Sequence, residues 1–148
     1  MDTALNATLK LAPTHGETGR GIAFLADEVK HFNDLFMTQG GSFKLLHVRL
    51  AVDEALLNAI EHGTRQRKEA IWLSFRLTPT VLEISVEDPG DGFEHFQFKE
   101  STAKDLGRVM SRTHTRSKGW GLAIIQSVTQ SMFWNTRGNR ITMLFYAQ

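Results

Sequence analysis

The sequence contains no cysteine, so it can form neither a disulfide bond nor a thiolate metal site, and no thiol can act as a nucleophile. This absence fits a reducing cytosol, and we expect a cytoplasmic protein. The sequence also lacks an excess of charge of one sign, since its formal net charge is +1. This near-neutral charge argues against a protein that binds nucleic acid or a membrane surface by electrostatic attraction. No apolar run approaches the length of a membrane span. Because no basic region followed by an apolar run comes after Met1–Thr3, we expect no signal peptide.

What the chain does contain is enough for one globular domain. Hydrophobic residues make up 41% of its 148 residues, and we expect a single domain over residues 1–148. Alternation of apolar and polar residues predicts strands, and a period of 3.6 residues predicts helices. The expected strands cover residues 7–11, 71–77, 82–87, 132–135 and 140–146, and the expected helices cover residues 17–37, 43–62 and 119–128. Ser42 is the expected N-cap of the central helix.

The central helix, expected at 43–62, carries an unusual polar arc. Its members are Glu54, Asn58, Glu61 and His62, which share one side at 100° per residue. A helix needs only one polar face for solvent, so an arc between apolar flanks suggests a carboxylate, an amide and an imidazole that point into a pocket. A second solvated stripe is the alternative, and this helix alone leaves both open.

Two stretches with glycine add to this helix. Asp88 stands at the end of an expected strand, and Gly90 and Gly92 follow it without side chains that could block a ligand. Because an ionised aspartate only accepts hydrogen bonds, Asp88 suits an amino group such as that of adenine, although a plain turn out of the sheet is the alternative. Gly119 and Gly121 open the last helix, where free backbone N–H groups suit phosphate. The usual phosphate loop is absent, so a nucleotide would need another scheme.

Taken in order, these stretches form one pattern: Glu54-x-x-x-Asn58-x-x-x-His62, then Asp88-x-Gly90-x-Gly92, then a basic segment at 93–118, then Gly119-x-Gly121. The pattern resembles the GHKL ATPase superfamily, which includes gyrase, MutL and histidine kinases. Within that superfamily, the chain resembles the stand-alone anti-sigma-factor serine/threonine kinases. The resemblance implies an α/β (α+β) two-layer sandwich of the Bergerat type, in which about three helices cover one face of a mixed, mostly antiparallel sheet.

The resemblance also implies a role for each matching residue, with ATP and Mg²⁺ as cofactors. Glu54 would be the general base, and Asn58 would coordinate the Mg²⁺ that bridges the ATP phosphates. Asp88 would accept a hydrogen bond from the adenine amino group. Gly90 and Gly92 would shape that end of the pocket.

The phosphate end would be closed by a lid. By the same resemblance, His62 would lie near the phosphates, and Gly119, Gly121 and Leu122 would close on them. The candidate cations for the γ-phosphate are Arg112, Arg116 and Lys118, each of which could equally be a solvated charge on a loop. Trp120 departs from the pattern, because the residue between the two glycines is often small or basic.

The leading hypothesis is an ATP-dependent protein serine/threonine kinase that binds a sigma factor and phosphorylates a STAS-type anti-anti-sigma protein. A homodimer is implied by the resemblance alone. Arg20 is where related proteins present an arginine to these partners, although an ordinary exposed helix residue is the alternative. A non-catalytic module that uses ATP only to fix its shape, and a catalytic-domain fragment of a two-component histidine kinase, are the rival functions. Glu54 favours catalysis, because an inactive binder would not need that carboxylate.

Overall fold

The computed structural model describes residues 4–37, 41–63, 69–90 and 120–148. The elements in chain order are β1 (Leu5–Leu11), α1 (His15–Phe36), α2 (Leu45–Asn58), the π-helical turn η1 (Ala59–Gly63), β2 (Ile71–Leu77), β3 (Val81–Glu87), α5 (Trp120–Val128), β4 (Ser131–Trp134) and β5 (Arg140–Tyr146). Every strand and helix expected from the sequence within these ranges is present. None of the helices in the described ranges offers an apolar stretch long enough to cross a bilayer.

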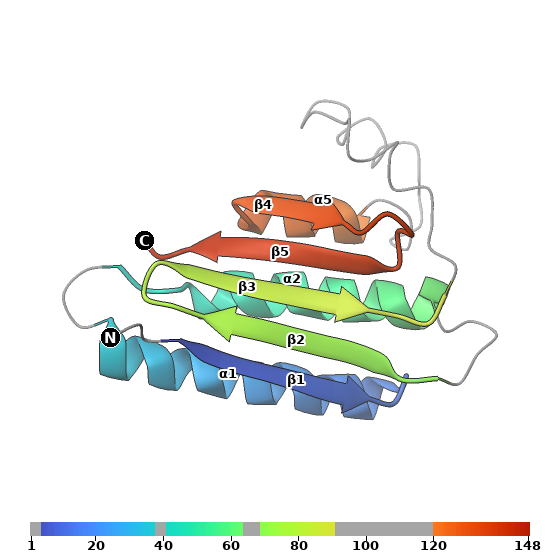
Figure 1. Ribbon diagram of the computed structural model, residues 1–148, viewed down its shortest axis with the longest axis horizontal. Helices are drawn as coiled ribbons and strands as arrows, with labels where there is room; N and C mark the ends of the chain where they lie inside the picture. Colours follow the sequence, from blue (N-terminus) through green and yellow to red (C-terminus); the bar gives the residue numbers. More distant parts are fainter. Residues whose placement is uncertain (1–3, 38–40, 64–68, 91–119) are drawn as a thin grey trace.

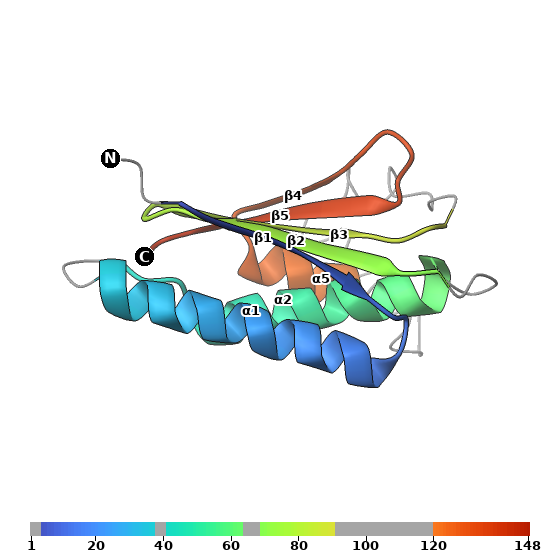
Figure 2. The same cartoon turned by 60° about the horizontal axis from the view of Figure 1, so that its bottom comes forward.

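The five strands form one sheet in the order β1-β2-β3-β5-β4. The α-helices α1, α2 and α5 all lie on the same face of it, as Figure 2 shows from the side. The expected two-layer sandwich is therefore confirmed. Within the described strands, all neighbouring pairs are antiparallel, whereas the resemblance implied a mixed sheet.

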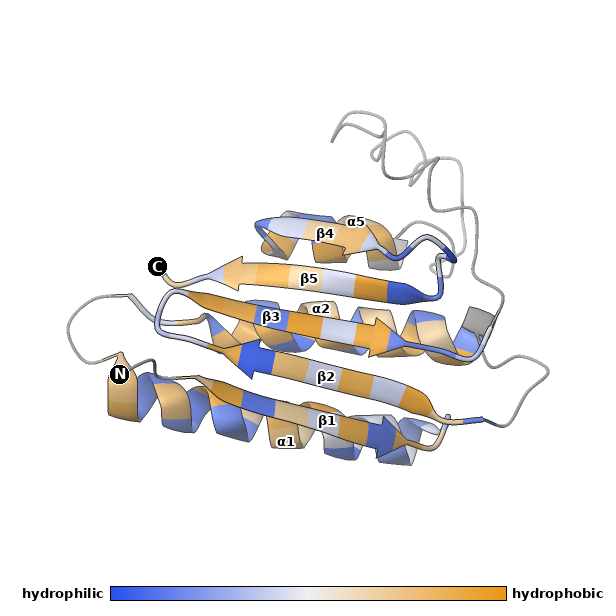
Figure 3. Cartoon of the chain, in the orientation of Figure 1, coloured by the Kyte–Doolittle hydropathy of each residue, from blue (hydrophilic) through white to orange (hydrophobic). Residues whose placement is uncertain are grey.

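The hydrophobic core lies between the sheet and the helices. Hydrophobic and hydrophilic residues alternate along β2 and β3 (Figure 3), and the apolar set of each strand is buried. From α2, Val52 and Leu56 pack into the same core. Burial of a side chain of this size contributes about 1.5–3 kcal/mol. These contacts hold α2 between α1 and α5 (Figure 1), so they also position the polar residues that α2 carries.

The start of α2 differs from the sequence prediction. Ser42 is not its N-cap; Lys44 takes that place and makes no capping hydrogen bond through its side chain. Ser42 instead exchanges two backbone hydrogen bonds with Gln148, at 2.6 and 3.0 Å. The Asn33 side chain then satisfies both the N–H and the carbonyl of Phe43, each at 3.0 Å. The chain is thus held before the helix by partners from α1 and from the C-terminal residue, and the helix begins at 45.

The end of α2 also differs from the single helix expected to reach residue 62. The α-helix ends at Asn58, and the chain continues as the π-helical turn Ala59–Gly63. Such a turn widens the helix locally and occurs frequently at functional sites. It lies beside the end of β3 in both Figure 1 and Figure 2.

Candidate functional site

Glu54 is the most unusual side chain of α2. It is only 4% exposed, and it is the one charged member of the small set of buried polar residues in the part of the chain that the structure describes. Burial of a carboxylate is costly and is rarely kept without a partner or a function. The polar arc predicted from the sequence is therefore turned into the protein at Glu54, and the solvated-stripe alternative is wrong for this residue.

Gly121 of α5 lies against the two polar residues at the end of α2. A Cβ atom added at Gly121 would lie 2.9 Å from Oε2 of Glu54, and 3.4 and 3.5 Å from the side-chain oxygen and nitrogen of Asn58. Because real Cβ atoms essentially never approach another heavy atom to within 3.0 Å, only glycine fits here without movement of a neighbour. Two of the sequence motifs, far apart in the chain, therefore meet at one place.

The first turn of α5 completes this end of the site. Its helix begins at Trp120, so the backbone of Gly121 and of the half-buried Leu122 belongs to the first turn, where N–H groups lack partners within the helix. The positive end of the helix dipole adds to these donors. A carboxylate, an amide and a helix N-terminus are thus gathered in a small volume.

Asp88 directly follows β3, at the end of the sheet beside η1. Its Oδ1 accepts a hydrogen bond of 2.8 Å from the backbone N–H of Gly90, which closes a tight turn. Its backbone is bonded to Asn139, because the Asp88 N–H donates to the Asn139 carbonyl at 2.9 Å and the Asn139 Nδ2 donates to the Asp88 carbonyl at 2.8 Å. The expected turn out of the sheet is therefore present, and its hydrogen bonds fix the position of the Asp88 carboxylate.

Comparison with protein families agrees with this arrangement. The family model for the histidine kinase-like ATPase domain matches residues 36–145, from the last residue of α1 into β5. The chain belongs to the histidine kinase-like ATPase domain family. A search of curated proteins finds no match to this chain.

Membership of this family makes the chain an ATP-using domain, and the site can be tested for its fit to ATP with Mg²⁺. Mg²⁺ prefers hard oxygen ligands and usually keeps several waters while it binds one or two protein groups and the substrate phosphates. Asn58 supplies an amide oxygen, the carboxylate of Glu54 lies one turn away, and Gly121 lets the start of α5 come close to both. The residues present therefore fit a magnesium–phosphate group at the α5 end of this ATPase domain.

Some predicted site residues cannot be placed. Gly92, Lys118, Gly119 and the other two candidate cations of the basic segment lie outside the described residues, as does the side chain of His62. Their implied roles remain predictions. Of the candidate site residues that the structure describes, Glu54, Asn58, Gly121 and Leu122 lie where α2 meets the first turn of α5, and Asp88 and Gly90 lie in the turn after β3.

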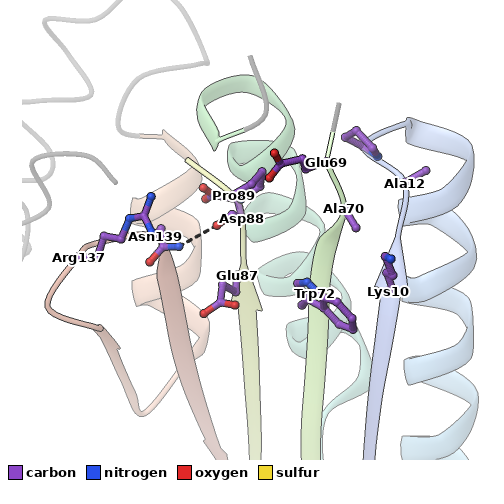
Figure 4. A pocket seen from close by; sticks show the side chains of 11 residues that line it. Lys10, Ala12, Glu69, Ala70, Trp72, Glu87, Asp88, Pro89, Arg137 and Asn139 are labelled. Atoms are coloured by element: carbon purple, nitrogen blue, oxygen red, sulfur yellow. Dashed lines mark hydrogen bonds between the residues drawn. The ribbon is translucent and has the colours of Figure 1, made fainter. Parts of the chain in front are cut away.

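A further feature was not foreseen from the sequence. A cavity of about 850 Å³ opens at the ends of β1, β2 and β3 (Figure 4). Its lining residues are Lys10, Ala12, Pro13, Glu69, Ala70, Trp72, Glu87, Asp88, Pro89, Arg137 and Asn139. The Lys10 ammonium lies 5.7 Å from the centre of the Trp72 ring, which explains how a tryptophan is accommodated on the polar side of β2. Asp88 and Asn139 therefore both border this cavity.

Proposed function

We propose that this histidine kinase-like ATPase domain is an anti-sigma regulatory factor. In this proposal it binds ATP with Mg²⁺, holds a sigma factor, and phosphorylates a serine or threonine of a STAS-type anti-anti-sigma protein. The observation that carries the proposal is the meeting of Gly121 with Glu54 and Asn58, since it joins a buried carboxylate to the start of a helix. The resemblance in the order of the motifs supplies the kind of kinase.

Each described residue has a chemical task in this proposal. Asn58 would hold the Mg²⁺, which would supply positive charge beside the phosphates, as phosphoryl transfer requires. The first turn of α5, with Gly121, donates backbone N–H groups to phosphate oxygens. Asp88 accepts from the adenine amino group and orients the nucleotide from the other end.

Glu54 performs the proton transfer. The hydroxyl oxygen of the acceptor serine forms a bond to the γ-phosphorus, the bond to the β–γ bridging oxygen breaks, and ADP leaves. The hydroxyl proton passes to the Glu54 carboxylate, a task for which general bases contribute typically 10²–10⁴-fold. Burial keeps this carboxylate away from bulk water. Its attraction for the proton is therefore screened less than it would be in water.

The direct test incubates the protein with labelled ATP, Mg²⁺ and a candidate anti-anti-sigma protein. Glu54→Gln should lower label transfer by at least about a hundredfold while ATP binding remains. Asp53→Asn is the matched control, because Asp53 is exposed on the same helix and its loss should leave transfer unchanged. If the Glu54→Gln variant still transfers the label at the wild-type rate, Glu54 is not the general base.

Two rival functions give different results in the same experiment. A non-catalytic module would bind ATP without any transfer, and the buried Glu54 is the feature that speaks against it. A fragment of a two-component kinase would place the label on histidine. Phosphohistidine is lost in acid, whereas phosphoserine is stable, so an acid wash separates the two.

Arg20 is proposed as a contact for the protein partners. Its side chain is 81% exposed and pairs with Glu17 at 3.1 Å, three residues earlier on α1. An exposed pair of this kind contributes little to stability, so a partner could take over the arginine at small cost. Arg20→Ala should therefore weaken binding of the sigma factor or of the antagonist and leave ATP affinity unchanged. Size measurement in solution tests the proposed homodimer.

A further inference from the structure

The backbone of Asp88 is held in an unusual way. The regular pairing of β3 with β5 ends at Glu87 and Arg140, and the Asp88 N–H extends it by one bond to the Asn139 carbonyl. In a regular antiparallel pair, the Asn139 N–H would return the bond to the Asp88 carbonyl. Here it donates instead to Oδ1 of Asn135, at 3.1 Å. The side-chain Nδ2 of Asn139 takes its place and donates to the Asp88 carbonyl (Figure 4).

The turn between β4 and β5 fixes the orientation of the Asn139 amide. Oδ1 of Asn135 accepts from the backbone N–H groups of Gly138, Asn139 and Arg140, at 3.0 to 3.1 Å. Nδ2 of Asn135 donates to Oδ1 of Asn139 at 2.8 Å, so the amide of Asn139 has partners at both ends. With 9% exposure and two fixed partners, this side chain has little freedom to turn.

Separate hydrogen bonds hold the carbonyl and the carboxylate of Asp88. The Asn139 side chain donates to its backbone carbonyl, and the backbone N–H of Gly90 donates to Oδ1 of its carboxylate. We infer that Asn139 is a positioning residue for Asp88 and that it thereby sets the preference of the site for adenine. This inference rests on the proposed function, in which Asp88 reads the adenine amino group. Guanine carries an oxygen where adenine carries the amino group, and this oxygen and the Asp88 carboxylate would both be hydrogen-bond acceptors. The selectivity for adenine over guanine therefore depends on the position of the carboxylate.

The neighbouring cavity makes the inference testable. Asp88 and Asn139 both line it, so water can reach the Asp88 carbonyl when the Asn139 amide is removed. Loss of the amide should therefore change the melting temperature little. The position of the Asp88 turn, however, would no longer be fixed, because water does not impose the geometry of a held amide.

The experiment uses Asn139→Ala and Asn139→Asp in the full chain. The aspartate keeps the size and the acceptor for Asn135 but lacks the donor to Asp88. Calorimetry measures the Kd of MgATP, MgGTP and magnesium tripolyphosphate, which has no base. We expect MgATP affinity to fall about tenfold, the ratio of ATP to GTP affinity to shrink by a similar factor, and tripolyphosphate affinity to stay within about twofold. Thr136→Ala, an exposed change in the same turn, is the control.

Each result decides one question. If the wild-type chain ignores MgATP, or if Asp88→Ala keeps its preference for ATP, the adenine contact of the proposed function fails and the inference fails with it. If Asp88→Ala loses that preference but both Asn139 variants keep it, only the inference is overturned. If the Asn139 variants weaken all three ligands equally and lower the melting temperature, Asn139 is merely structural.

Discussion

Replacement of Gly121 by alanine tests whether α5 really lies against the carboxylate of α2. The new methyl group would lie 2.9 Å from Oε2 of Glu54 and 3.4 Å from Oδ1 of Asn58. The nearest atom is the end of a side chain that can rotate, not backbone. The clash is therefore relieved by movement of the Glu54 carboxylate, the group assigned to proton transfer.

The expected cost in stability is small, because two effects oppose each other. Overpacking of a well-packed site typically costs about 1–3 kcal/mol. Replacement of glycine by alanine within a helix raises the free energy of unfolding by about 1 kcal/mol. The free energy of unfolding should therefore fall by between about 0 and 2 kcal/mol. Turnover should fall much further, by about a hundredfold, since a displacement near 1 Å can cost a catalytic group that much.

Calorimetric melting, MgATP titration and label transfer measure these quantities on the same preparation. Gly19→Ala is the matched control, since a Cβ added at Gly19 of α1 meets no heavy atom within 4 Å. That control should gain about 0.5–1 kcal/mol in unfolding free energy and keep full activity. If Gly121→Ala behaves like the control in all three assays, α5 does not touch Glu54 and the candidate site is wrongly assembled.

Further predictions concern the parts that support the site. Leu56→Ala should lower the free energy of unfolding by about 2–5 kcal/mol, because Leu56 is fully buried under the sheet. Leu46→Ala on the same helix should change it by less than about 0.5 kcal/mol, because that leucine is 67% exposed; equal losses would contradict the burial pattern. Asn33→Ala should cost about 1–3 kcal/mol in chemical denaturation, since both backbone groups of Phe43 lose their partner. Asn58→Ala should remove the Mg²⁺ dependence of ATP binding in calorimetry, and affinity that still falls on chelation would rule out Asn58 as a ligand.

Local patterns predicted the sheet well because they depend on neighbouring residues. The alternation over 71–77 and 82–87 fixes both the strands and the side that each residue faces, and the structure confirms it. The start of α2 could not be found in this way. Ser42 has the right chemistry for an N-cap, but its backbone is paired with Gln148 from the far end of the chain. The π-helical turn at 59–63 was not predicted either, because a search for a 3.6-residue period assumes a uniform helix.

The candidate site was predictable as a set of residues and not as a set of contacts. The spacing on α2 singled out Glu54 and Asn58, but angles around a helix do not say which side meets α5. Apolar character does not settle it either, because Leu46 and Leu50 on the same helix are exposed. Gly121 was expected to face phosphate, and its close approach to the carboxylate appears only once the two helices are packed.

The two ends of the site are held by different kinds of interaction. The Glu54 and Asn58 end depends on the packing of α5 against α2 in the helical layer, where Gly121 sets the distance. The Asp88 end depends on hydrogen bonds within the sheet layer, which run from the β4–β5 turn through Asn139. The contacts named here for the two ends come from different layers, and effects at sites without shared partners are largely independent. If the proposed roles of the two ends hold, we therefore expect phosphate binding and base recognition to be separable, so that a substitution at one end leaves the other property largely unchanged.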